Sequence, residues 1–348
     1  MPAGLKDRSL SVYRRTVMTP RTRILTRRDV AALISLEECM NAVEAAFRFH
    51  GEGRAQPPQV LGVHSGKGGF HIKAGTLALE KNYFAAKINA NFPDNARRFG
   101  LPMIQGVLVL MDAESGFPLA VTDSIEITTW RTAATTAVAA KHLARPDSRT
   151  VTICGCGNQG RAHLRALAKQ YELSYAYAWD ADEQRTSRFA AELTTELGVQ
   201  VKPATDLSPA CRDSDICVTC TPSESYFLQR DYVVPGTFVA GVGADNEKKQ
   251  ELDPELLRSA KVVTDVLAQC AVMGDLHHAL DLGVMGKADV YAELGEIVAG
   301  RKLGRESRDE IIVFDSTGMA LQDVAVAAAI YEKAVYLGRG MELEFGTL

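Results

Sequence analysis

The chain has 348 residues, of which 46% are hydrophobic and 24% are charged, a composition typical of soluble globular proteins. Its net charge of −4 argues against a nucleic-acid-binding protein, and no apolar stretch is long enough to span a bilayer. The length suggests two domains, each large enough for its own hydrophobic core.

The first residues of the chain, 1–23, are rich in Arg and Lys and contain no apolar segment. They therefore do not resemble a secretory signal. We expect a disordered basic arm, or a start codon placed upstream of Met18, with an organelle transit peptide as a more remote alternative.

Residues 24–143 predict antiparallel strands packed on helices. A short strand begins at Ile24, one helix runs from Thr26 to Leu33, and a capping box at Ser35 opens a second helix that ends near Glu52. The segments expected after it are strands at 60–63, 69–75, 84–90, 104–112 and 119–123, a polar loop at 94–100, and a helix at 125–143.

After Pro146 strands and helices alternate, which predicts an α/β fold with a doubly wound parallel sheet. A final strand at 311–314 leads through a polar turn into a long helix from about Leu321 to Leu337. Because this helix follows the completed sheet, we expect it to pack back on the first domain. The alternating segments are 150–154, 161–170, 175–179, 182–197, 199–202, 206–211, 215–220, 237–241 and 260–264.

The strongest functional signal is a glycine-rich turn between a strand and a helix. Gly155 allows a tight turn, Gly157 lets the backbone approach a pyrophosphate, and Gly160 lets the helix pack closely on the strand. The helix N-terminus then offers free N–H groups and a positive dipole end to phosphates. These features predict a dinucleotide-binding (Rossmann) domain.

Asp180 ends the next strand, twenty positions after Gly160. A carboxylate at this place accepts hydrogen bonds from both ribose hydroxyls and repels a 2′-phosphate. The sequence therefore favours NAD over NADP, although Arg185 lies near enough in sequence to weaken that preference.

The seven cysteines do not predict a metal or redox site. Cys217 and Cys220 form a CxxC, but it lies inside a strand-like segment, and no second pair has metal-site spacing. We expect buried free thiols, which fit a reducing cytoplasm.

Three charged residues in apolar surroundings are candidates for chemistry. Lys87 lies in an apolar strand, where it either extends to solvent, the alternative favoured by sequence alone, or occupies a cleft with a depressed pKa. Arg131 opens an alanine-rich helix, where its charge opposes the dipole and calls for a carboxylate or phosphate partner. Asp245 follows a strand at the carboxyl edge of the parallel sheet, where ligands bind. Ser316 lies in a strand-to-helix turn and could simply be a helix cap.

Several spaced blocks resemble the ornithine cyclodeaminase/mu-crystallin family, and most closely its archaeal-type alanine dehydrogenases. The resemblance covers nearly all of the chain after about residue 23. The blocks are Lys87–Asn91 with Gly100–Pro102, Leu110–Asp112 with Gly116, Arg131–Ala134 with Ala140–Leu143, Gly155–Gly160, Gly241–Asp245 with Gln250–Asp253, and Phe314–Gly318 with Gln322 and Asp323.

The resemblance implies a homodimer whose subunits have an NAD-binding Rossmann domain at 144–314 and a substrate-binding and dimerisation domain at 24–143 plus 315–348. Lys87 corresponds to the active-site lysine of the family and Asp245 to its catalytic aspartate. Arg131 corresponds to an arginine that meets the substrate carboxylate and the nucleotide. The positions that correspond to cofactor contacts are Asn158, Gln159, Asp180, Thr221, Lys249 and Ser316.

Two departures from the family pattern bear on function. Met103 replaces a frequent Thr or Ser, which puts one cofactor hydrogen bond in doubt. Lys73 stands where ornithine-cyclising members carry a glutamate and where alanine dehydrogenase-like members carry a basic residue. A lysine would repel the distal ammonium of ornithine and attract a carboxylate.

We therefore expect an NAD-dependent oxidoreductase that interconverts an L-amino acid with its imino or oxo acid, as an alanine dehydrogenase-like enzyme or an imine reductase. Lys73, Lys87 and Arg131 would hold the substrate carboxylate and polarise the C=N or C=O bond, and Asp245 would transfer a proton. Two alternatives stay open: an ornithine (or lysine) cyclodeaminase that recycles NAD within each turnover, and a non-enzymatic ligand-binding protein of the mu-crystallin kind.

Overall fold

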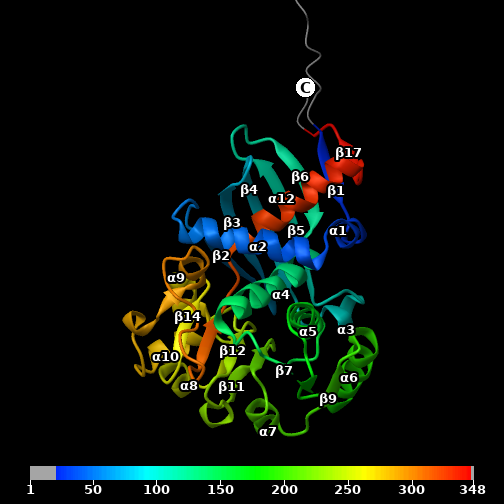
Figure 1. Ribbon diagram of the computed structural model, residues 1–348. Helices are drawn as coiled ribbons and strands as arrows, with labels where there is room; N and C mark the ends of the chain where they lie inside the picture. The colour runs from blue at the N-terminus through cyan, green and yellow to red at the C-terminus, as the bar shows by residue number, and fades with distance from the viewer. Residues whose placement is uncertain (1–20, 346–348) are drawn as a thin grey trace, which may run out of the picture.

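The computed structural model describes residues 21–345, so residues 1–20 of the arm predicted at 1–23 lie outside the described residues. Its end was predicted wrongly, because Thr22 and Arg23 belong to a strand. Two β-sheets, drawn one above the other in Figure 1, each pack against helices, and the long helix α4 (Ser124–Leu143) lies between them. This two-domain α/β arrangement confirms the predicted fold class. Within residues 21–345, no helix is both long enough and apolar enough to cross a membrane.

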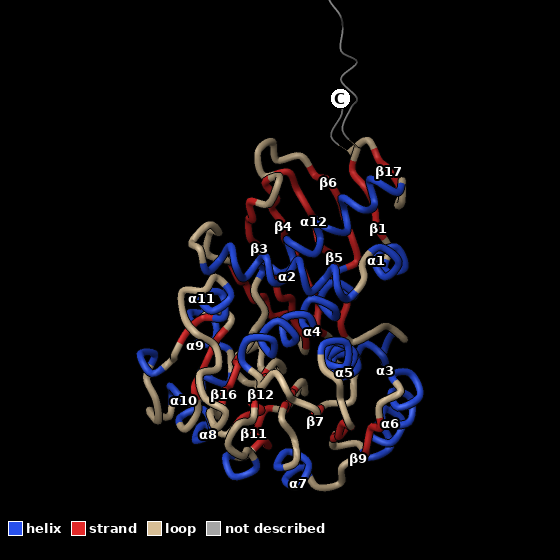
Figure 2. The backbone as a smooth tube through the Cα atoms, in the orientation of Figure 1, coloured by secondary structure: helices blue, strands red, loops and turns tan. Residues whose placement is uncertain are grey.

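The upper sheet has seven strands. They are β1 (Thr22–Leu25), β2 (Gln59–Ser65), β3 (Gly68–Ala78), β4 (Asn82–Asn91), β5 (Ile104–Asp112), β6 (Pro118–Asp123) and β17 (Met341–Leu343). Their order is β17-β1-β6-β5-β4-β3-β2, and neighbours run antiparallel except for the parallel pair β1 and β6. Figure 2 shows β1 and β17, from opposite ends of the described chain, side by side at one edge.

One face of this sheet is covered by helices α2 (Leu36–Gly51) and α12 (Ala320–Leu337), which cross in front of the strands in Figure 1. Helix α1 (Arg27–Leu33) lies near the β1 edge, and Ser35 opens α2 with the predicted capping box. Gly75 of β3 allows α12 to approach closely, since a Cβ there would lie 3.1 Å from a Leu321 methyl carbon. The last helix therefore packs back on the first sheet, as predicted.

The other face of the upper sheet is apolar and open to solvent. Leu61, Ile72, Ile88 and Val107 lie opposite one another across four neighbouring strands, β2 to β5. Leu61 is 57% exposed, Ile88 38% and Val107 45%. An antiparallel sheet with one solvated face usually places polar side chains there, so this row of apolar residues is exceptional.

The lower sheet has eight parallel strands in the order β15-β14-β16-β12-β10-β7-β8-β9. The strands are β7 (Thr150–Cys154), β8 (Tyr175–Trp179), β9 (Gln200–Pro203), β10 (Ile216–Thr219), β12 (Phe238–Gly241), β14 (Lys261–Thr264), β15 (Ala292–Glu293) and β16 (Ile312–Asp315). A separate parallel pair is formed by β11 (Glu224–Leu228) and β13 (Gln250–Leu252). The central strands β10, β12 and β16 are buried throughout, as parallel strands covered on both faces are.

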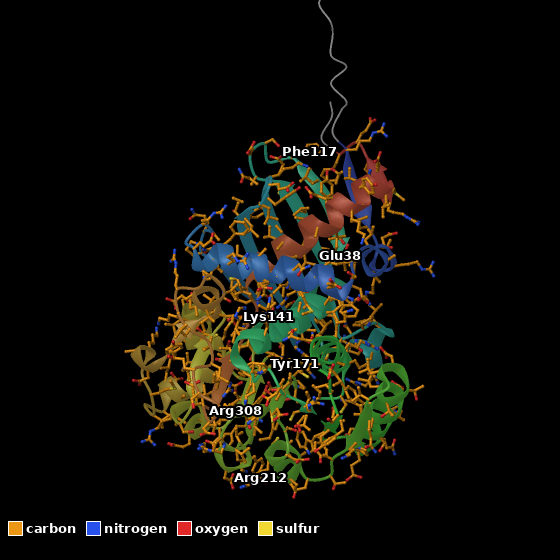
Figure 3. All side chains as sticks on the ribbon, viewed as in Figure 1. Glu38, Phe117, Lys141, Tyr171, Arg212 and Arg308 are labelled. Carbon is orange, nitrogen blue, oxygen red and sulfur yellow. The ribbon has the colours of Figure 1, made fainter. Side chains whose placement is uncertain are left out.

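Short and medium helices connect the strands of the lower sheet. They are α5 (Asn158–Gln170), α6 (Glu183–Leu197), α7 (Leu207–Arg212), α8 (Pro254–Arg258), α9 (Leu267–Met273), α10 (Asp275–Asp281) and α11 (Leu294–Val298), with 3₁₀ turns η1 (Arg230–Tyr232) and η2 (Lys287–Asp289). Helix α4 joins the two halves of the molecule. Lys141 of α4 pairs with Glu44 of α2, and the Tyr171 hydroxyl after α5 donates to the Ala140 carbonyl. Figure 3 shows Lys141 and Tyr171 along this junction.

The structure differs from the sequence prediction in three places of the upper domain. The polar loop expected at 94–100 contains a short helix, α3 (Asn95–Phe99), so that prediction is wrong. Strand β17 was not predicted, because three exposed residues carry no periodic signal and depend on β1 for their partner. The first strand also begins at Thr22, two residues before the predicted Ile24.

Candidate active site

Two lysines lie side by side inside the upper domain. Lys73 of β3 and Lys87 of β4 are direct cross-strand partners, so their side chains project from the same face, toward α12. Lys73 is 8% exposed and Lys87 is 3% exposed. Like charges at such a pair of positions destabilise a sheet, so this arrangement needs compensation from other elements. It also shows that the solvent-directed alternative for Lys87 is wrong.

The compensation comes from the first turn of α12. The Lys87 ammonium donates to a carboxylate oxygen of Asp323 at 2.8 Å, and Arg131 Nε lies 3.3 Å from the same carboxylate. Arg131 also donates to the Gln322 amide oxygen at 3.1 Å. Burial pushes the pKa of Asp323 upward, but the charges of Lys87 and Arg131 outweigh it, so the pKa of this carboxyl lies below its usual value.

Burial also governs the state of Lys87. Loss of hydration is the largest cause that lowers its pKa, Asp323 opposes the shift, and Arg131 and Lys73 reinforce it, which leaves a pKa of about 7. A lysine with this pKa can hold or release a proton near neutrality. Groups tuned in this way gather at catalytic sites.

Lys73 binds a turn of backbone between β16 and α12. Its ammonium donates to the carbonyl oxygens of Thr317 at 2.6 Å and Gly318 at 2.8 Å. The buried carboxylate of Asp265 holds this turn in place by two hydrogen bonds. It accepts from the Ser316 hydroxyl at 2.9 Å and from Gly318 N at 2.6 Å. Ser316 is therefore a structural part of this turn, and its contact with the cofactor stays a prediction.

Position 318 requires a glycine, because the guanidinium of Arg131 packs against it. The residue has a φ of 85°, and a Cβ there would lie 2.6 Å from a guanidinium nitrogen of Arg131. Arg131 itself is the eighth residue of α4, not the first. The prediction of a helix-start arginine is therefore wrong, whereas the anionic partner that it called for is present as Asp323.

Asp245 lies beyond the carboxyl end of β12, at the edge predicted for ligand binding. Its carboxylate accepts from the Lys249 ammonium at 2.8 Å, and its side chain is 51% exposed. Loss of hydration raises the pKa of Asp245, but the favourable interactions of its carboxylate with Lys249, Lys73 and His71 outweigh that effect. The pKa of Asp245 is therefore lower than its usual value. These facts describe a carboxylate that is open to solvent on one side and faces cations on the other.

The glycine-rich turn leaves the start of α5 open. Gly157 is the N-cap of α5, and no side chain of the described residues bonds to the first N–H groups of the helix. Gly155 has a φ of 110°, and a Cβ on it would lie 2.8 Å from the Cys220 carbonyl oxygen. A Cβ on Gly160 would lie 2.0 Å from the Gly155 carbonyl oxygen, whereas one on Gly157 would have no described atom within 4 Å.

Around this turn lie the other residues predicted to hold a dinucleotide. Asp180 accepts from Cys156 N at 2.9 Å, and Arg185 lies 3.7 Å from its carboxylate, as the sequence suggested. Asn158 is exposed at the helix start. The amide oxygen of Gln159 is buried without a partner among residues 21–345.

Two parts of the site were missed by sequence reasoning. Asp323 was noted only within a family block, and Asp265 was not considered at all. A signal for Asp323 was present, because it and Gln322 are polar residues inside an otherwise apolar stretch of α12. The seven cysteines are free, as predicted, and the described part of the chain contains no cluster of metal-ligating side chains.

Comparison with known proteins places this site in a family. Residues 21–337 match the ornithine cyclodeaminase/mu-crystallin family. The chain is 39% identical to the alanine dehydrogenase of Archaeoglobus fulgidus over 325 residues, which cover 93% of this chain and 98% of that protein.

Two solved structures have the same fold over almost their whole length. One is an archaeal alanine dehydrogenase dimer with bound NAD, with a TM-score of 0.89 at 39% identity, covering 93% of this chain and 99% of that one. The other is the Δ1-pyrroline-2-carboxylate reductase of Thermococcus litoralis in complex with NADH and L-proline, with a TM-score of 0.87 at 31% identity, covering 92% and 100%. The family match, the sequence identity and the shared fold all extend over almost the whole chain. The chain therefore belongs to the ornithine cyclodeaminase/mu-crystallin family.

Proposed function

We propose that this protein is an NAD-dependent oxidoreductase that interconverts an L-amino acid and its imino or oxo acid. The observation that carries the proposal is the buried cluster of Lys73, Lys87 and Arg131 near Asp323. The negative charge of Asp245 also acts on this cluster, because it opposes the lowering of the Lys73 pKa that burial causes. Cations that are held together in this way suit the carboxylate of an amino acid. Relatives with the same fold are named as an alanine dehydrogenase and a Δ1-pyrroline-2-carboxylate reductase.

The residues present fit a dinucleotide. The open N-terminus of α5 and the clear space above Gly157 suit a pyrophosphate, and Asp180 suits the ribose hydroxyls. The unpartnered amide oxygen of Gln159 is a buried acceptor that a bound cofactor could satisfy. When bound, NAD supplies the acceptor, and NADH the donor, of a hydride at the substrate Cα.

The side chains of the chain have separate tasks in this proposal. Arg131 and Lys73 hold the substrate carboxylate, and Lys87, in its ammonium form, polarises the C=N or C=O bond. Asp245 moves a proton to or from the amine or the attacking water. Asp323 keeps the three cations together in a site that they would otherwise destabilise.

A spectrophotometric screen tests the proposal. Pyruvate, glyoxylate, oxaloacetate and cyclic imines are each combined with NADH, and the oxo acids also with ammonia or methylamine. We expect consumption of NADH with at least one of them. Lys87→Ala and Asp245→Asn should lose most of this turnover while their circular dichroism spectra stay those of folded protein. Full turnover by both folded variants would refute the assignment.

A cyclodeaminase is the second candidate, and Lys73 disfavours it. The Lys73 ammonium is buried beside Lys87 and Arg131, so a distal ammonium of ornithine would meet three cationic side chains. Incubation of L-ornithine with NAD separates the two activities. A cyclodeaminase releases ammonia without accumulation of NADH, and a dehydrogenase accumulates NADH.

We also propose that the protein is a homodimer formed through the open face of the upper sheet. The row of Leu61, Ile72, Ile88 and Val107 forms an apolar surface that a monomer would leave in water. A second copy of the same face would cover it with twofold symmetry. The related archaeal alanine dehydrogenase is named as a dimer.

A further inference from the structure

We propose that Glu251 is a positioning residue that ties the Thr221 loop to the Asp245 loop, and so holds the cofactor side and the proton-transfer side of the site in one geometry. The inference rests on the proposed function. Glu251 lies in β13, is fully buried, and was not among the predicted site residues.

The carboxylate of Glu251 joins two loops that leave neighbouring strands. One oxygen accepts from Thr221 N at 2.6 Å and from the Thr221 hydroxyl at 2.7 Å. The other accepts from the Thr219 hydroxyl at 2.8 Å and from Gly243 N at 2.8 Å. Thr219 is the last residue of β10 and Thr221 lies two residues beyond it, whereas Gly243 lies after β12 and two residues before Asp245. An ionised carboxylate accepts about four hydrogen bonds, so its acceptor capacity is fully used.

The two loops meet only because Gly243 has no side chain. A Cβ on Gly243 would lie 2.5 Å from the Glu251 carboxylate and 2.5 Å from the Thr221 carbonyl oxygen. The Thr221 loop, the Asp245 loop and Glu251 are therefore packed too closely for any side chain at position 243. In this proposal, a shift of one loop displaces the other through the shared carboxylate.

The backbone of Glu251 is itself held in place by hydrogen bonds to another buried carboxylate. The buried carboxylate of Asp275 accepts from Glu251 N at 2.7 Å and from Leu252 N at 2.9 Å. Asp315 in turn accepts from Asp275 N at 3.3 Å and from Leu276 N at 2.9 Å. Because Asp315 directly precedes Ser316, this series of carboxylates links Glu251 to the turn that binds Lys73.

A glutamine at this position would break the link without removing bulk. Each carboxylate oxygen of Glu251 accepts one backbone N–H, from Thr221 or from Gly243. In Glu251→Gln one of the two oxygens becomes an NH₂ group, which cannot accept, so one backbone N–H is left unpaired. One of the two loops is then released.

Asp215 provides a matched control at the opposite edge of the same sheet. One oxygen of its carboxylate accepts from the backbone N–H groups of Arg149 and Thr150 and from the Thr150 hydroxyl, and the other oxygen pairs with Arg145. Asp215 directly precedes β10, whereas Glu251 binds the last residue of β10 and the loop after it. Asp215→Asn should therefore reduce stability as Glu251→Gln does, without moving either loop of the site.

The experiment compares wild type, Glu251→Gln, Asp215→Asn and Thr219→Val by NADH fluorescence titration and by steady-state kinetics with the substrate found in the screen. We expect Glu251→Gln to weaken NADH binding about tenfold, a loss of about 1.4 kcal/mol. Its kcat should fall between about tenfold and a hundredfold through misplacement of the reacting groups. The KM for the substrate should change less, because Glu251 does not touch it. Thr219→Val, which removes one of the four donors, should show the same pattern to a smaller extent.

The outcomes separate the two proposals. Wild type that neither binds NADH nor turns over any substrate refutes the proposed function. With an active wild type, the positioning role is refuted if folded Glu251→Gln matches Asp215→Asn in kcat and NADH affinity. If Glu251→Gln does not fold, Thr219→Val decides: reduced kcat and NADH affinity support the role, and wild-type values refute it.

Discussion

Asp323 is the residue on which the buried cationic cluster depends. It is 2% exposed, pairs with Lys87, and lies beside Arg131. Among residues 21–345, the direct partners of the Lys73 ammonium are the carbonyl oxygens of Thr317 and Gly318. Removing one member of a buried ion pair leaves an uncompensated charge, which is more destabilising than removing both. The charges of Lys87 and Arg131 are therefore balanced at close range by the carboxylate of Asp323 in α12.

We expect Asp323→Asn to lower the free energy of unfolding by about 3–5 kcal/mol, because it leaves buried cations without a counter-charge. The double variant Lys87→Met with Asp323→Asn should recover part of that loss, since it removes the ammonium as well. Urea denaturation followed by circular dichroism measures both. A double variant as unstable as the single one would show that the ion pair is not the source of the effect.

At the same scale, Lys87 predicts a pH dependence. Burial is the main reason that its pKa lies at about 7. Because the ammonium form polarises the substrate, kcat/KM for imine reduction should fall as the pH rises through about 7. In Lys87→Arg the guanidinium stays protonated, so the pH–rate profile should lose this decline. A variant that kept the decline would assign it to another group.

At the scale of the elements, substitutions in the glycine turn before α5 distinguish effects on stability from effects on cofactor binding. Gly157→Ala places its methyl in open space, so we expect unchanged thermal stability and a loss of NADH affinity of tenfold or more, on the order of 1.4 kcal/mol. Gly160→Ala meets the Gly155 carbonyl oxygen, so it should lower stability by about 1–3 kcal/mol. Differential scanning calorimetry and NADH fluorescence distinguish the two. Equal NADH binding by wild type and folded Gly157→Ala would argue against a pyrophosphate at this turn.

The same turn shows which part of the fold the sequence could predict. The strand at 150–154 and the helix that follows Gly160 have clear periodicity, and the glycines have local steric roles. Helix α3 and strand β17 escaped prediction because they are short. Strand β17 also depends on pairing with β1, which lies more than three hundred residues away in the chain.

The candidate site was less accessible to prediction without the family resemblance. A lysine in an apolar strand such as β4 either extends to solvent or is buried, and burial requires a counter-charge from another element. For Lys87 that counter-charge is Asp323, which lies 236 positions later in the chain. Glu251 binds Thr221 across 30 positions, and Asp265 binds Gly318 across 53 positions. Tertiary pairing of this kind leaves little mark on local sequence.

For the whole molecule, the open face of the upper sheet predicts the assembly. If the proposed dimer forms through this face, we expect Ile88→Lys with Val107→Lys to make the protein a monomer, because two charges per subunit would be buried in the proposed interface. Sedimentation velocity measures the change. Leu303→Lys is the control, since Leu303 is 67% exposed and lies between α11 and β16, outside this sheet. A double variant that remains dimeric would place the interface elsewhere.

Helix α12 has a consequence for how the protein is made. Lys73, Lys87 and Arg131 leave the ribosome long before the carboxylate that neutralises them. Until Asp323 has been synthesised, Lys87 and Arg131 lack the carboxylate that they contact in the folded protein. A chain interrupted before this helix would therefore lose a layer of the upper domain and the counter-charge of the candidate site together.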